Sequence, residues 1–534
     1  MLRRMAPPIL HRALLHHRAG DVVAAIPLYR RVLAADPRNA DAHHLLGLAL
    51  HQNGALAEAR DALETAHGLH PTEPLYATTL GRLHLEAHRP DAAEAVLRPT
   101  CGLHPDDTGL GAALALAVAH QGRHAEAEPL LRAALCHAPE DRELAGALGL
   151  VLRGTGRAVT AIPLLERAAG TADGLSNLAL ALSDAGRLPE AIAACAAALA
   201  LEPLHADAAY NQATALLLAG RYRAAWPGFE RRWQRRGHQP PFPHPSPRWQ
   251  GEPTTGRLLL HAEQGLGDTI QMARFLPALA ARHRLLVAVP RTLLDLLRPL
   301  APGATWHALE DRLPGADLHC PLMSLPSVLN IGLADIPGAP YLTAAPLPRV
   351  AALPGPRIGM TWAGNPAYPA DAGRSLPVEA LAPLCRIPGI TLISLQKDAA
   401  APPGMLDWSA ELGDMAATAA VVAGLDLVIS VDTAVAHLAG ALGRPVWLLN
   451  RHAPCWRWML NRADSPWYPT LHQFRQPAPG DWGSVIAAVV QKLSTAWDRS
   501  TSISTSTPSP APDGTCTTPP PARSTSGTMS RTSA

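Results

Sequence analysis

The stretch "GLALHQNGALAEARDALETAHGLHP", residues 47–71, holds one period of a repeat that decides the fold of the first half of the chain. Its glycine and its final proline recur at intervals of 34 residues, and such a fixed period is the signature of a repeated structural unit. The prolines of this period are Pro37, Pro71, Pro105 and Pro139. The glycines are Gly20, Gly54, Gly122 and Gly156, with His88 in the remaining position, followed after a shortening by four residues by Gly186 and Gly220.

Small residues recur at fixed distances from the six glycines and from His88, the seven turn positions of the repeat. An alanine follows five residues after each one, and another small residue lies seven residues before it. Two helices can pack closely only where their side chains are small. A glycine ends the first helix of such a pair because it adopts positive φ without strain, and a proline stops the second because it lacks an amide hydrogen. The pattern resembles the tetratricopeptide repeat and predicts a helical solenoid over residues 1–235.

A solenoid of this kind presents a concave face to a partner peptide or protein. We therefore expect the array to recruit a partner, with the alternative that it only scaffolds or dimerises the chain. At its end, we expect a short basic run to form the solvated face of the last repeat helix, with the alternative that it binds an acidic surface. This run consists of Arg231, Arg232, Arg235 and Arg236.

The composition argues against several classes of partner and site. The net charge of +2 is too small to indicate a nucleic-acid or membrane-surface partner, and 534 residues suffice for more than one domain. The seven cysteines are scattered and form no C-x-x-C pair, which indicates neither disulfides nor a zinc site. The sequence contains no run of 18 apolar residues, so it predicts no membrane span. We expect a cytoplasmic protein without a metal site.

The second half alternates aliphatic strands with helical segments, as in parallel sheets that are covered on both faces. The expected strands lie at 257–263, 284–290 and 304–309, and then at 357–364, 390–396, 425–432 and 445–450. A Pro/Ala-rich break at 343–356 separates the two sets. We expect a Pro-rich linker at 236–256, lobes at 257–356 and 357–498, and a disordered Ser/Thr/Pro-rich tail at 499–534. Ligands of such sheets bind beyond the carboxyl ends of the strands.

The first of these strand ends carries Gly265, Gly267 and Asp268. A dinucleotide-binding G-x-G-x-x-G turn is excluded because Ile270 occupies the third glycine position. The glycines would let a ligand approach the backbone. Asp268 is either an N-cap of the following helix or a general base that takes a proton from a hydroxyl group.

The second strand end is the segment "SVDTAVAHLAGALGRP", in which Asp432 and Thr433 precede a helix. Free amide groups at that helix start, together with the Thr433 hydroxyl, would suit an anionic phosphate. His437 lies four residues later on the same helix face and could contact the same ligand. The alternative is that His437 is a packing residue.

The remaining candidates follow two other strands of the second set. Asn365 and Arg374 lie in the loop after the strand at 357–364, and arginine suits bidentate recognition of phosphate. Gln396 and Lys397 end the strand at 390–396, and Lys397 is one of only two lysines in the chain. Both pairs are therefore candidates for contact with an anionic ligand.

The G-x-G-D turn and the D-T-x-x-x-H-L-A-x-A-x-G segment together resemble bacterial glycosyltransferases of the heptosyltransferase-like kind. The order of repeat array and transferase is similar to that of O-linked N-acetylglucosamine transferases. The resemblance implies a two-lobed GT-B (double Rossmann-like) domain and an inverting, metal-independent transfer from a nucleotide-sugar held mainly by the C-terminal lobe. The acceptor would be a protein or glycan recruited by the array, and no cofactor beyond the donor is implied.

The resemblance also implies roles for the residues. Asp268 would be the catalytic base, Thr433, Ala434 and His437 would flank the donor phosphates, and Arg374 would contact the diphosphate. The remaining predicted donor contacts are Gly265, Gly267, Asn365, Gln396, Lys397 and Asp432. The chain has Ala434 where that family typically carries glycine, and Arg374 where lysine is common. Two alternatives remain: a non-catalytic interaction protein that keeps the transferase fold, and a regulatory protein that binds plain nucleotides.

Overall fold

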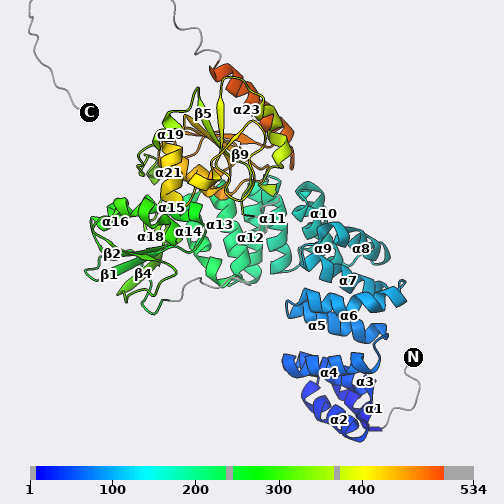
Figure 1. Cartoon of the computed structure of the whole chain (residues 1–534). Helices are drawn as coiled ribbons and strands as arrows, with labels where there is room; N and C mark the ends of the chain where they lie inside the picture. The colour runs from blue at the N-terminus through cyan, green and yellow to red at the C-terminus, as the bar shows by residue number, and fades with distance from the viewer. Residues whose placement is uncertain (1–7, 236–243, 366–372, 498–534) are drawn as a thin grey trace, which may run out of the picture.

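A computed structural model of the chain describes residues 8–235, 244–365 and 373–497, and Figure 1 shows a helical array followed by two lobes that each contain a parallel sheet. The expected tail at 499–534 lies outside the described residues, as do the first residues of the array and of the linker. The expected order of an all-helical array and an α/β pair of lobes is confirmed.

The array consists of consecutive helix pairs, as the 34-residue period predicts. Its helices are α1 (Pro8–Arg18), α2 (Val22–Ala35), α3 (Ala40–Gln52), α4 (Leu56–Leu69), α5 (Pro74–Glu86), α6 (Pro90–Leu103), α7 (Thr108–His120), α8 (His124–His137), α9 (Arg142–Gly154), α10 (Ala158–Ala168), α11 (Ala172–Asp184), α12 (Leu188–Leu201), α13 (Ala206–Leu218) and α14 (Tyr222–Phe229).

The repeated residues form these pairs for the expected reasons. All six turn glycines have positive φ, between 73° and 80°, and His88 adopts φ 55° in the position without a glycine. The alanine five residues after each turn is fully buried in all seven pairs. A Cβ added at Gly47 would lie 2.6 Å from Leu63 Cγ, so only a small residue permits this helix contact.

The N-terminal lobe contains a four-stranded parallel sheet in the order β3-β2-β1-β4. Its strands are β1 (Arg257–His261), β2 (Arg284–Val289), β3 (Thr305–Ala308) and β4 (Leu318–Pro321), and its helices include α15 (Leu266–Ala273), α16 (Leu276–Ala280), α17 (Leu294–Leu297) and α18 (Leu325–Val328). The central strand β1 is flanked by β2 and β4, and β4 was not predicted from the sequence.

The C-terminal lobe contains a six-stranded parallel sheet in the order β10-β9-β8-β5-β6-β7. Its strands are β5 (Arg357–Thr361), β6 (Thr391–Ser394), β7 (Leu406–Asp407), β8 (Leu427–Val431), β9 (Val446–Asn450) and β10 (Leu471–Arg475). Its helices include α19 (Pro348–Ala351), α20 (Ala382–Cys385), α21 (Met415–Ala423), α22 (Ala434–Ala441) and α23 (Trp482–Trp497). Strand β8 is buried at every position, as a central parallel strand should be.

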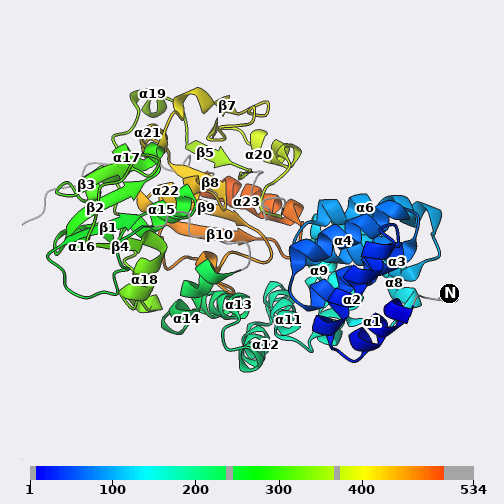
Figure 2. The same cartoon turned by 90° about the horizontal axis from the view of Figure 1, so that it is seen from below.

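The last repeat shares its core with the two lobes. Figures 1 and 2 both place α13 and α14 against them, and the rings of Tyr222, Trp226 and Phe229 on α14 all pack around Trp456 of the C-terminal lobe. The Trp226 indole also donates a 2.7 Å hydrogen bond to the carbonyl of Ile331. The end of the array is therefore built into the same hydrophobic core as the sheets.

The described part of the expected linker packs against the N-terminal lobe. The amide of Trp249 donates to the carbonyl of His319 in β4 over 2.8 Å, and the amide of His319 donates to the carbonyl of Pro247 over 3.0 Å. The Trp249 side chain is buried. Residues 247–249 thus lie alongside β4 and cover its free edge.

Candidate active site at the lobe interface

The turn between β1 and α15 carries the predicted Gly-x-Gly-Asp group. Gly265 is the N-cap of α15, and Asp268 is the third residue of the helix. The Asp268 Oδ2 atom accepts a 3.0 Å hydrogen bond from the Gly265 amide. Asp268 therefore does stabilise the helix start, but from inside the first turn and not as the N-cap itself. Its side chain keeps 23% of its surface exposed.

The second oxygen of Asp268 meets an arginine of the other lobe. Arg457 lies in the short 3₁₀ helix η9 (Trp456–Trp458) of the C-terminal lobe, and its guanidinium forms an ion pair with Asp268 Oδ1. Its Nε also donates a 2.7 Å hydrogen bond to Gln271 Oε1 on α15. Burial works against the charge of Arg457, but Asp268 and the neighbouring Cys455 outweigh it and raise the pKa.

Sequence reasoning did not find Arg457, because it belongs to none of the motifs at the strand ends. The available signal was its position between two tryptophans, Trp456 and Trp458, since a charged residue in an apolar cluster requires a partner. With Arg457 in place, both oxygens of Asp268 have protein partners. A carboxylate can accept up to about four hydrogen bonds, so capacity for a hydroxyl group remains.

The start of α22 has no side-chain cap. Thr433 occupies the N-cap position, but its hydroxyl lies 3.0 Å from Ser430 Oγ and does not accept from the helix amides. No side chain therefore caps the first amides of the helix, those of Ala434 and Val435, and the helix dipole adds a partial positive charge there. This geometry suits an anion.

His437 is buried behind this helix start. Its Nδ1 lies 2.9 Å from the Tyr468 hydroxyl, and its ring packs on Trp458 with 5.1 Å between centroids. Burial, reinforced by the charges of Arg457 and Arg274, holds the pKa of His437 well below its usual value. The imidazole is thus neutral at physiological pH and is held by packing as well as by a hydrogen bond.

The two helix starts meet directly across the lobe interface. A Cβ added at Gly267 would lie 2.7 Å from His437 Cδ2 and 3.3 Å from the Ala434 Cα. Gly267 therefore permits close packing of α15 against α22, a reason for glycine that the sequence did not reveal.

Positive charge surrounds the helix start of α22. Asp432, which directly precedes Thr433, has a raised pKa because of burial, and the charges of Arg457, Arg374 and Arg451 oppose this shift. Its Oδ1 lies 3.9 Å from His437 Nε2. The structure thus brings together Asp268, Asp432, Thr433, Ala434 and His437, with Gly265 and Gly267 on the facing turn.

The other predicted donor contacts lie around this group. Gln396 Oε1 accepts from the amides of Trp362 and Ala363, so this side chain holds the loop that follows β5. Asn365 is exposed and Arg374 is half-buried, on either side of residues 366–372, which lie outside the described part. Lys397 is exposed and donates to the carbonyl of Gly413 over 3.3 Å, and no described contact links it to the other candidates.

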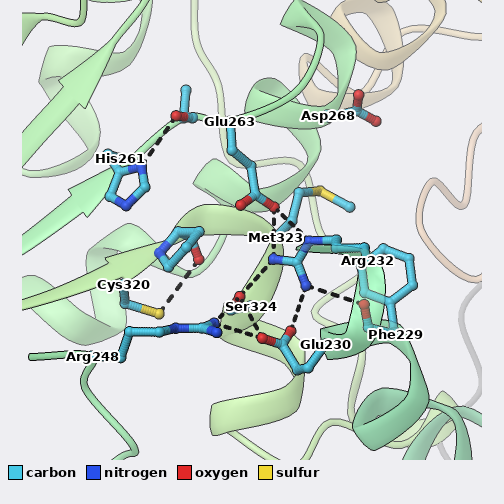
Figure 3. A network of polar contacts seen from close by, with 12 residues as sticks. Phe229, Glu230, Arg232, Arg248, His261, Glu263, Asp268, Cys320, Met323 and Ser324 are labelled. Carbon is cyan, nitrogen blue, oxygen red and sulfur yellow. Dashed lines mark hydrogen bonds and ion pairs between the residues drawn. The ribbon is translucent and has the colours of Figure 1, made fainter. Parts of the chain in front are cut away.

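A buried ionic network ties the turn before α15 to the end of the array (Figure 3). Arg232 donates to Glu263 over 2.8 Å and to Ser324 and Glu230 over 2.7 Å. The expected solvated role is wrong for Arg232, which is 4% exposed because it fills the junction between array and lobe. Burial raises the pKa of Glu263 to about 7, and Glu263 Oε2 has no partner among the described residues.

Three further observations concern metal ligands, membrane helices and a separate pocket. Within residues 8–235, 244–365 and 373–497, no three His, Cys, Asp or Glu side chains gather in a way that could hold a metal ion. Among the same residues, no helix has the length and apolarity that a membrane crossing requires. A pocket of about 350 Å³ next to His283 and Leu285 lies at the amino end of β2, away from the strand ends described above.

Comparison with known families agrees with both halves of this architecture. Residues 10–74, 78–138, 113–175 and 176–239 match the tetratricopeptide repeat. Residues 412–454 match glycosyltransferase family 9 (heptosyltransferase). The latter range contains α21, β8, α22 and β9, and therefore the whole Asp432–His437 segment.

Among individual proteins, the chain is 29% identical over 369 residues to Protein FlbA of Caulobacter vibrioides, a match that spans 59% of this chain and 60% of that relative. A solved structure of MamA is similar at 25% identity and a TM-score of 0.26, over 30% of this chain and 93% of its own length. A solved structure of PilW, a type IV pilus biogenesis factor, is similar at 18% identity and a TM-score of 0.33, over 36% of this chain and 92% of its own length. The chain therefore carries N-terminal tetratricopeptide repeats followed by a domain of glycosyltransferase family 9 (heptosyltransferase).

Proposed function

We propose that this protein is an inverting, metal-independent glycosyltransferase that moves a sugar from a nucleotide-sugar donor to a protein or glycan acceptor recruited by the repeat array. One observation carries the proposal: the uncapped start of α22 lies inside the family 9 segment, and the turn with Asp268 faces it from the other lobe.

In this proposal, the donor diphosphate binds at the start of α22. The amides of Ala434 and Val435 and the hydroxyl of Thr433 donate to it, and Arg374 adds positive charge. These groups would stabilise the leaving diphosphate without a metal ion. The other donor contacts proposed from the sequence are Gly265, Gly267, Asn365, Gln396, Lys397, Asp432 and His437.

The transfer step is a single displacement at the anomeric carbon. Asp268 takes the proton of the acceptor hydroxyl while that oxygen forms its bond to the anomeric carbon on the face opposite the diphosphate. The bond between the anomeric carbon and the phosphate oxygen breaks at the same time, and the nucleoside diphosphate leaves with the electron pair. The configuration of the sugar is thereby inverted.

A second candidate has an observation in its favour. Both oxygens of Asp268 are engaged by protein groups, the Gly265 amide and the Arg457 guanidinium, as they would be in a purely structural turn. This would suit a non-catalytic interaction protein with a transferase fold.

A panel of nucleotide sugars offered to the purified protein separates these candidates. We expect one nucleotide sugar to raise the unfolding temperature more than the matching plain nucleotide, and mass spectrometry to detect a glycosylated product that is lost in cells without the protein. Absence of binding to every donor supports the non-catalytic candidate. Equal stabilisation by plain nucleotides supports a nucleotide-binding regulator.

A further inference from the structure

Arg457 and the candidate base belong to different lobes. Arg457 comes from η9 of the C-terminal lobe, and Asp268 from α15 of the N-terminal lobe. The ion pair between them can therefore exist only while the two lobes are in contact at this point. The guanidinium group itself is largely shielded from water, with 8% of the Arg457 side chain exposed.

The guanidinium contacts two residues of the same helix face. Asp268 and Gln271 are three residues apart on α15, which places their side chains side by side. Arg457 reaches the first through Nη2 and the second through Nε. Because the guanidinium is planar and rigid, these two contacts fix its plane and hence the direction of the Asp268 carboxylate.

The last repeat of the array supports Arg457 from behind. The guanidinium lies 4.4 Å from the ring centroid of Trp456. Trp456 in turn packs against Tyr222, Trp226 and Phe229 of α14, with ring centroids between 5.9 and 6.2 Å apart. Arg457 thus has little freedom to move away from Asp268 while α14 is docked.

We propose that Arg457 is a positioning residue that orients the Asp268 carboxylate for the acceptor hydroxyl, and that it does so only when the lobes are closed and the last repeat is in place. This inference rests on the proposed function. A misplacement of about 1 Å in a reacting group can lower a rate by about 100-fold, so an unrestrained carboxylate would be a poor base.

The test compares steady-state kinetics of full-length variants with a donor on which the unmodified protein is active. We expect Arg457→Gln to lower kcat by roughly 10- to 100-fold with little change in KM for the donor. Arg457→Lys keeps the positive charge but loses the planar guanidinium with its several N–H donors, so it should recover only part of kcat. This variant replaces Arg457→Gln in the test if the glutamine variant does not fold. Arg462→Gln is the matched control, because Arg462 lies in the same loop and its side-chain partners among the described residues, Asp464 and the Met459 sulfur, belong to its own lobe.

A double substitution distinguishes positioning from a general structural effect. If Arg457 acts through Asp268, then Asp268→Asn combined with Arg457→Gln is no slower than Asp268→Asn alone. Multiplicative losses in the double variant would overturn the inference, as would a normal kcat in Arg457→Gln or a loss confined to donor KM. If the unmodified protein transfers no sugar from any donor, the proposed function fails, and this inference with it.

Discussion

Gly267 of the N-terminal lobe lies against the imidazole ring of His437 in the C-terminal lobe. A Cβ at this position would come within 2.7 Å of His437 Cδ2, and the ring cannot turn aside because Tyr468 and Trp458 hold it. The contact brings the start of α15 to the start of α22. The relative position of the two predicted halves of the site thus depends on the absence of a single methyl group.

Gly267→Ala should therefore force the lobes apart. We expect a loss of about 1–3 kcal/mol in the free energy of unfolding, the usual range for overpacking a dense contact, and a fall in transfer activity. Gly303→Ala is the control, since nothing lies within 4 Å of a Cβ built there. Urea unfolding followed by tryptophan fluorescence measures both variants, and equal stabilities would contradict the proposed packing role.

The network at the junction of array and lobe should be sensitive to loss of one partner. Arg232→Met leaves Glu263 buried without its cation, and removing one member of a buried ion pair destabilises a protein by about 3–5 kcal/mol. Adding Glu263→Leu should restore much of that stability, because the unpaired carboxyl group is then gone.

The neighbouring Arg231 provides the control for this pair. Among the described residues its side chain donates to the carbonyl of Leu204 at the surface, so Arg231→Met should have little effect. Calorimetry should compare the unfolding temperatures of the unmodified protein, Arg232→Met, Arg232→Met with Glu263→Leu, and Arg231→Met. If Arg232→Met is no less stable than Arg231→Met, the network does not hold the junction.

The stability of the N-terminal lobe should depend on pH through His261. Burial lowers the pKa of His261 from 6.5 to about 4, and its Nε2 lies 3.2 Å from His319 Nδ1. Between these two values the unfolded chain binds a proton that the folded chain does not, so the free energy of unfolding decreases as the pH falls from 6.5 to 4. The decrease from this residue is about 3 kcal/mol.

His261→Gln removes this titration. Urea unfolding at several pH values should show that the variant loses less stability on acidification than the unmodified protein does. Parallel pH profiles for the two proteins would show that His261 is not the group responsible.

Much of the fold could be predicted because its determinants are local. The turn glycines and buried alanines recur in every helix pair, so one period predicts the others. The central strands, such as β8, are continuous aliphatic runs. Strands β4 and β10 escaped because "LHCP" and "LHQFR" are short, contain histidine and lack an aliphatic run.

The site could be predicted only in its sequence-local part. Thr433 and His437 lie at the start of one helix, and Asp268 lies in the first turn of the helix that follows β1, so motifs reveal them. Arg457 is separated by 186 residues from its partner Gln271, and only the packing of two lobes and the last repeat brings them together. The neighbouring tryptophans indicate that Arg457 needs a partner, but they do not indicate which residue that partner is.

The role of Asp268 tests the account most directly. Asp268→Asn keeps a side-chain oxygen that can accept from the Gly265 amide but removes the base, so the variant should fold and bind the donor nucleotide sugar as the unmodified protein does. Its rate of sugar transfer, measured as product formed per enzyme at saturating donor and acceptor, should fall by roughly 100- to 10,000-fold. A variant that folds, binds donor and transfers sugar at nearly the unmodified rate would show that Asp268 only shapes the turn.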